Sequence, residues 1–166
     1  MSFAVSTLVP DGRYTRSSAP GTLAVVAVSV SALAAATFAI SSIGVLAPNL
    51  AATFNLSRTG IGLVTSLVFL GAAVGSGPAG RLTDRTDPAR VLGAAMTVFA
   101  GAIALAALAP DRAVLMLAAV LAGVAYGGVN PPTNVVVAGR LARRLGFFLS
   151  LKQSGVPLGG LLAGVV

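Results

Sequence analysis

Five long apolar runs, separated by short polar segments, dominate this chain of 166 residues. A helix that crosses a bilayer needs about 20 consecutive, predominantly apolar residues, and each run has about that length or more. The chain is therefore predicted to be an all-α, polytopic bundle of transmembrane helices over residues 22–166. Residues 1–21 are predicted to form a polar cytoplasmic tail. The five predicted helices span about residues 22–47, 59–79, 91–109, 113–138 and 145–166.

The composition agrees with a bilayer as the solvent for this chain. Hydrophobic residues make up 56% of it and charged residues only 9%, whereas about 25% of the residues of a soluble domain are charged. A net charge of +7 would fit a nucleic-acid-binding protein if the basic residues formed one face. They instead form short clusters between apolar runs. The predicted partner is therefore the lipid bilayer, and no nucleic-acid partner is predicted.

The residue types that carry most enzyme chemistry are absent. The chain has no Cys and no His, which removes thiolate metal sites, Cys nucleophiles and imidazole bases. All four acidic residues lie in polar segments: Asp11, Asp84, Asp87 and Asp111. The sequence therefore predicts no catalytic residue, no metal site and no cofactor. A Ser or Thr acting with Lys152 stays conceivable, but nothing in the sequence positions them together.

The basic residues predict the orientation of the chain. If consecutive runs cross the bilayer in alternation, only Arg58 and Arg112 fall on one side. The positive-inside rule makes the richer side cytoplasmic, so the N-terminus is predicted to be cytoplasmic and the protein to be multi-pass in the plasma or inner membrane. The basic residues assigned to the cytoplasmic side are then Arg13, Arg16, Arg81, Arg85, Arg90, Arg140, Arg143 and Arg144, with Lys152 just beyond them.

Polar residues mark the starts of three predicted helices. Ser57 precedes the second run, Asp87-Pro88 the third, and Pro110-Asp111 the fourth. Ser and Asp are favoured N-cap residues, and proline is favoured at the first helical position. Asp87 is accordingly expected to cap the third helix.

The fourth run carries amides and prolines deep in apolar sequence. At 100° per residue, Tyr126, Asn130 and Asn134 lie on one side of a helix. Pro131 and Pro132 remove two backbone donors and are expected to kink this helix. Two interpretations remain open for the polar side chains: a hydrogen-bonded contact between helices, or the lining of a substrate pathway.

The fifth run contains Lys152, the one charged residue within a predicted span. Either its side chain snorkels to the interface or makes a structural contact, or it is a cavity cation that attracts anionic substrate. Gln153 beside it can add hydrogen bonds. Pro157 is expected to bend the helix, and Gly155 and Gly159 have the spacing that lets helices pack closely.

The segment between the second and third runs reads Gly80-Arg-Leu-Thr-Asp84-Arg85-Thr-Asp-Pro-Ala-Arg90. In pattern and position it resembles the signature loop of the major facilitator superfamily, Gly-x-x-x-Asp-Arg-x-Gly-x-[Arg/Lys]-[Arg/Lys]. Asp87 stands where Gly is usual, and Ala89 replaces one basic residue. Residues 150–160 also resemble fifth-helix sequences of that superfamily. The resemblance extends over about residues 21–166.

This resemblance implies a secondary active or facilitative transporter of a small solute that works by alternating access. In the family, two six-helix halves enclose the substrate, so the chain resembles the N-terminal portion of a longer carrier, with the missing C-terminal helices as its partner. It also implies that Gly80, Asp84, Arg85 and Arg90 form a latch on the cytoplasmic side. The alternative for the arginines is a purely topological role.

A second class of function remains open. Five helices could form a non-transporting scaffold or partner subunit, or an inactive truncated carrier. The resemblance favours the transporter, and no feature of the sequence identifies the solute, the coupling ion or the oligomeric state.

Overall fold

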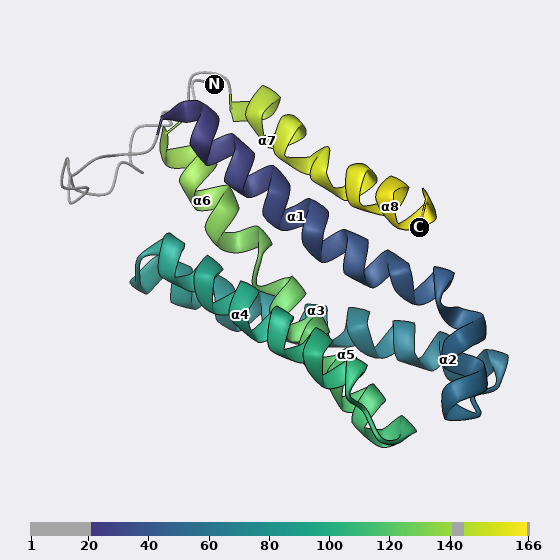
Figure 1. The fold of residues 1–166 in the computed structure, drawn as a ribbon. Coiled ribbons are helices and arrows are strands. Elements are labelled where there is room, and N and C mark those ends of the chain that lie inside the picture. Colours follow the sequence, from purple (N-terminus) through teal and green to yellow (C-terminus); the bar gives the residue numbers. More distant parts are fainter. Residues whose placement is uncertain (1–20, 141–144, 166) are drawn as a thin grey trace, which may run out of the picture.

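The computed structural model describes residues 21–140 and 145–165, and these form an all-α bundle (Figure 1). No β-strand occurs among the described residues. The predicted charges at Arg13, Arg16, Arg143 and Arg144 lie outside them. The helices are α1 (Thr22–Val45), α2 (Ala47–Phe54), α3 (Arg58–Arg85), α4 (Pro88–Ala107), α5 (Arg112–Gly127), α6 (Asn130–Arg140), α7 (Leu145–Gln153) and α8 (Gly155–Val165).

The helix starts follow local capping chemistry. The Ser57 hydroxyl accepts a hydrogen bond from the backbone N–H of Gly60 at 3.2 Å, at the start of α3. Asp87 caps α4 by accepting from the Ala89 N–H at 2.9 Å, which confirms the expectation for this residue. The Asp111 carboxylate accepts two bonds at the start of α5. Each cap satisfies N–H groups that have no partner within the helix.

Two of the long helices, α3 and α5, pack with their backbones in close approach. A methyl group added at Gly71 or Gly75 of α3 would collide with the backbone of α5 at Val120 or Val124. Added at Gly123 or Gly127 of α5, it would collide with the backbone of α3. Small residues at matching heights therefore set this pairing, as in other membrane helix pairs.

A second close pair joins the two ends of the chain. α8 lies along α1 (Figure 1), and a methyl group at Gly155 or Gly159 would strike the backbone carbonyl of Val30 or Ala34. Gly160 and Gly164 have the same four-residue spacing, but a methyl group at Gly164 would have nothing within 4 Å. The spacing alone therefore does not distinguish packed from open glycines.

Two predicted helices are each interrupted, and a proline stands four residues after the last residue before each interruption. Proline lacks the N–H that would bond to the carbonyl four residues earlier. For Pro131 that carbonyl belongs to Gly127, where α5 ends, and for Pro157 it belongs to Gln153, where α7 ends. Gly128 and Val129 separate α5 from α6, and Ser154 separates α7 from α8. A single proline in α3, Pro78, leaves that helix continuous.

The segment around the signature motif is more helical than the sequence suggested. The motif was expected in a loop, but α3 continues through it to Arg85 and α4 begins at Pro88. Only Thr86 and Asp87 lie outside helices. The end of an apolar run shows where a helix leaves its apolar surroundings, not where the helix ends. A helix can continue into a polar segment because its backbone hydrogen bonds are internal.

The outer surface of the bundle is apolar. Four of the described helical stretches are long and apolar enough to cross a membrane: Leu23–Val45, Arg58–Arg85, Pro88–Ala107 and Arg112–Gly139. Large side chains on them are exposed, among them Leu23, Phe69 and Val74. Exposed apolar area of this extent marks a surface that contacts lipid or protein, so the chain is an integral, multi-pass membrane protein.

Candidate functional site

The side chain of Lys152 extends from α7 toward α6 and is enclosed by protein. Its side chain is 1% exposed, the lowest exposure among the charged residues that the structure describes. The ammonium donates to Oδ1 of Asn130 at 3.0 Å and to Oδ1 of Asn134 at 2.6 Å. The side chain therefore points into the bundle and ties two helices together through amide groups.

The helix interruptions position these three residues. Asn130 is the first residue of α6, directly after the break, and Asn134 follows one turn later on the same face. The Thr133 hydroxyl donates to the carbonyls of Val129 at 2.8 Å and Asn130 at 3.0 Å, and so secures the first turn of α6. Lys152 stands one residue before the end of α7. Both halves of the cluster thus sit beside proline-dependent breaks.

The other residues expected on the pathway, Tyr126 and Gln153, are not hydrogen-bonded to Lys152 in the described part of the chain. Tyr126 is half-buried and packs against the apolar cluster that contains Ala36 and Phe99. Gln153 ends α7 and is exposed. Of the helix-bend residues, Pro132, Gly155 and Gly159 are buried, Pro131 is half-buried and Pro157 is exposed.

The motif residues gather at the α3–α4 connection. Asp84 and Arg85 lie in the last turn of α3, Arg90 lies in the first turn of α4, and all three are exposed. Gly80 is half-buried, and a methyl group there would meet nothing within 4 Å. The described residues therefore leave room for a larger side chain at Gly80. The carboxylate of Asp84 and the guanidinium groups of Arg85 and Arg90 are accessible to a partner.

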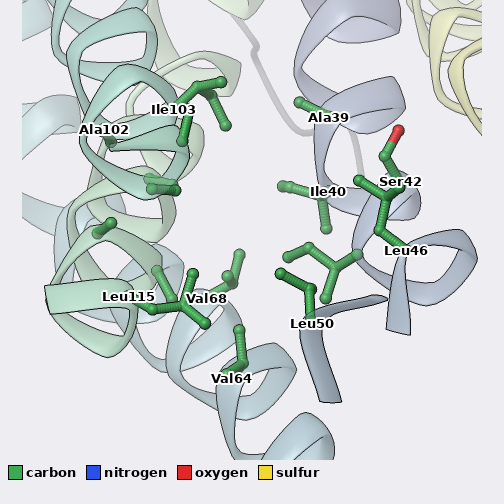
Figure 2. A pocket seen from close by; sticks show the side chains of 16 residues that line it. Ala39, Ile40, Ser42, Leu46, Leu50, Val64, Val68, Ala102, Ile103 and Leu115 are labelled. Carbon is green, nitrogen blue, oxygen red and sulfur yellow. The ribbon is translucent and has the colours of Figure 1, made fainter. Parts of the chain in front are cut away.

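Sequence reasoning missed an apolar cavity beside the C-terminal part of α1. It has a volume of about 270 Å³ and lies between α1, α2, α3, α4 and α5. Figure 2 shows Ile40, Leu50, Val68 and Leu115 among its lining, with the Ser42 hydroxyl as a polar group at its edge. Such residues give no sequence signal because packed and cavity-lining aliphatic side chains look alike. Among the described residues, no cluster of His, Cys, Asp or Glu could hold a metal ion.

Comparison with known proteins shows which family this chain resembles. The model of the Major Facilitator Superfamily matches residues 29–166. A gentisate transporter of Corynebacterium glutamicum is 30% identical over 124 residues, which are 74% of this chain and 28% of that protein. A probable 4-methylmuconolactone transporter of Cupriavidus pinatubonensis is 32% identical over 122 residues, 73% of this chain and 28% of that protein.

A gallate transporter of Pseudomonas putida is 29% identical over 128 residues, which are 76% of this chain and 28% of that protein. The chain therefore spans less than a third of the length of each of these relatives. No solved structure matches the chain. The family match covers most of the chain, and it coincides with the helical architecture and the motif at the α3–α4 connection. The chain therefore belongs to the Major Facilitator Superfamily.

Proposed function

We propose that this chain is the N-terminal part of a longer carrier that moves a small solute across a membrane by alternating access. Family membership and the three relatives named as transporters support transport in general. Alternating access in such carriers rocks one helical repeat or bundle against another around a fixed site. The partner bundle would be the C-terminal helices of the same carrier.

One observation carries the proposal: a charged side chain is buried between two interrupted helices. Lys152 is 1% exposed and is held by Asn130 and Asn134. Intramembrane ionisable residues and broken helices mark substrate and ion pathways in transporters. We assign this group to the solute pathway, with Tyr126 and Gln153 as further members that would be brought to it in the complete carrier.

The exposed motif residues are proposed to form the cytoplasmic latch. Asp84 can accept hydrogen bonds from a helix N-terminus, and Arg85 can donate to a carboxylate or to helix C-terminal carbonyls. Gly80 and Arg90 flank them on the two helices that meet there. The described residues offer these groups no ion-pair partner, so the latch would close against helices of the other half. We place this end of the bundle, with the N-terminus, in the cytoplasm.

The test is solute uptake by the complete carrier in proteoliposomes. Gentisate and gallate are the first probes, because they are named for two relatives. We expect saturable uptake of at least one acid that empty liposomes do not show. The Lys152→Met variant should reconstitute equally well and take up the acid at a rate lower by at least about tenfold, the scale of a lost charged hydrogen bond.

A matched variant controls for the loss of any cation. Arg58→Met also removes one positive charge, but Arg58 is exposed at the start of α3, so uptake should persist. A carrier that reconstitutes correctly and takes up neither acid above empty liposomes would contradict transport of these solutes. It would favour the alternative, a membrane scaffold or partner subunit.

A further inference from the structure

Among the residues that the structure describes, no carboxylate forms an ion pair with the buried ammonium of Lys152. The chain contains only four acidic residues. Asp84, Asp87 and Asp111 are exposed and stand at helix ends, where two of them cap α4 and α5. Within the described residues, no ion pair joins any of them to Lys152. In the described part of the chain, the buried charge of Lys152 is therefore held by neutral groups alone.

Neutral amides compensate this cation only in part. An ammonium has three N–H donors, and the two asparagine oxygens satisfy two of them. Amide dipoles carry no net charge, and an ion buried without an opposite charge is costly in a low-dielectric interior. An anion that reached this ammonium would be stabilised far more strongly than in water.

The two asparagines differ in a way that suggests where an anion would enter. Asn130 is half-buried and begins α6, whereas Asn134 is exposed even though its oxygen lies 2.6 Å from the ammonium. Asn134 therefore covers the side of the cation that the described helices leave open. A rotation about its side-chain bonds would open that side of the ammonium without moving a helix.

We propose that Lys152 is the counter-charge for a carboxylate-bearing solute, and that the Asn134 amide occupies the position of the carboxylate while the site is empty. This inference rests on the proposed transport function and names its substrate class. A carboxylate oxygen replaces Oδ1 of Asn134 on the ammonium, and Asn130 continues to hold the cation from the buried side. A carboxylate is acceptor-only, which matches a site whose central group only donates.

The test measures binding, so that it is independent of transport. The complete carrier, purified in detergent, is heated in sodium acetate, lactate or benzoate, with sodium chloride at equal ionic strength as the reference. We expect at least one carboxylate to raise the unfolding temperature, and its uncharged amide (acetamide, lactamide or benzamide) to leave it unchanged. A ligand that binds only the folded protein must raise its stability in this way.

Two variants assign the effect to the proposed atoms. Lys152→Met should raise the carboxylate concentration for half-maximal stabilisation by at least about tenfold. Asn134→Ala removes the competing amide, so it should lower that concentration by about threefold to tenfold. Arg58→Met, which removes an exposed cation at a helix start, should leave the response as in the wild type.

The outcomes separate this inference from the transport proposal. The inference is overturned if no carboxylate stabilises the wild type, if the neutral amide stabilises it equally, or if Lys152→Met responds as the wild type does. A purely structural role for the cluster predicts weaker binding in Asn134→Ala, which would also overturn it. Lys152-dependent stabilisation without solute uptake would support the binding site and contradict transport.

Discussion

At the scale of the residue, Lys152 shows how the surroundings of a charge change its role. The long side chain could have reached an interface from its place in α7, but it is buried and bonded to two amides. Burial commits the residue to partners inside the protein, because an ammonium without them would be costly in an apolar medium. A residue held in this way is a candidate for function, since a simpler apolar side chain would fill the same space.

The same reasoning predicts the stability of the empty carrier. Lys152→Met removes the cost of burying an ammonium, but it also leaves the side-chain oxygens of Asn130 and Asn134 without their donor. Because these two effects oppose each other, the unfolding temperature should change little in the absence of solute. Thermal unfolding in detergent checks this. A marked loss of stability would mean that the hydrogen bonds to Asn130 and Asn134 hold α6 and α7 together.

The motif offers a second prediction at this scale. Asp84→Asn removes a charge that is exposed in the last turn of α3, so the protein should insert and fold as before. If Asp84 closes the latch with a charge-assisted bond, uptake should fall by about tenfold. Initial uptake rates at matched membrane levels provide the measurement.

Asp87→Asn is the matched control for Asp84. It removes a carboxylate three residues away, and Asn is as good an N-cap as Asp, so α4 should keep its cap and uptake should persist. Wild-type uptake in Asp84→Asn would remove the latch assignment, and equal loss in both variants would point to the net charge of this end of the bundle.

At the scale of the element, two close helix pairs organise the bundle. α3 with α5, and α1 with α8, approach through glycines that face backbone across the interface. In an apolar solvent there is little hydrophobic drive between helices, so close packing supplies much of the association. The proline-dependent breaks leave α6 against α1, α3 and α4, and α7 against α1, and the Lys152 cluster joins α6 to α7.

Two glycines of α3 test this directly. At Gly75 a methyl group would collide with the backbone of Val124, whereas at Gly77 it would meet nothing within 4 Å. Gly75→Ala should therefore cost about 1–3 kcal/mol through overpacking. Gly77→Ala should be neutral or stabilise by up to about 1 kcal/mol, because Ala is the better helix former. Unfolding temperatures in detergent compare the pair, and equal effects would contradict the close α3–α5 contact.

At the scale of the whole molecule, the proposed orientation can be tested because the chain has no native Cys. Ala89 and Ala113 are exposed and hold equivalent positions, each two residues after the aspartate that caps its helix. Ala89 lies at the start of α4, and Ala113 lies at the start of α5, beyond the other end of α4. With the N-terminus in the cytoplasm, Ala113→Cys should react with a membrane-impermeant maleimide in intact cells, and Ala89→Cys only after permeabilisation. The reverse pattern would invert the orientation.

The size of the native product tests the proposal of a longer carrier. The chain covers 28% of three of its relatives. An antibody against residues 1–20 should therefore detect a membrane protein of well over twice the 16.3 kDa of this chain. A band at 16.3 kDa would contradict the longer carrier and favour a partner subunit.

Much of the helical framework could be predicted from the sequence, because it depends on neighbours along the chain. Apolar runs located the long helices, and Asp87 capped α4 as expected. The breaks at Gly127 and Gln153 follow from prolines four residues later. The extent of α3 through Arg85 and the presence of α2 could not be read from run length, since polar residues also form helix.

The sequence by itself determined that this chain is an all-α membrane protein, where α3, α4 and α5 begin, and which residues carry unusual polarity. Only the tertiary structure decided which glycines face a neighbouring backbone and which, like Gly164, face open space. It also showed that Lys152 does not reach the interface, by placing Asn130 and Asn134 around an ammonium 22 and 18 positions away in the chain. The physical reason is that capping and helix breaking act over a few residues, whereas burial depends on how distant helices pack together.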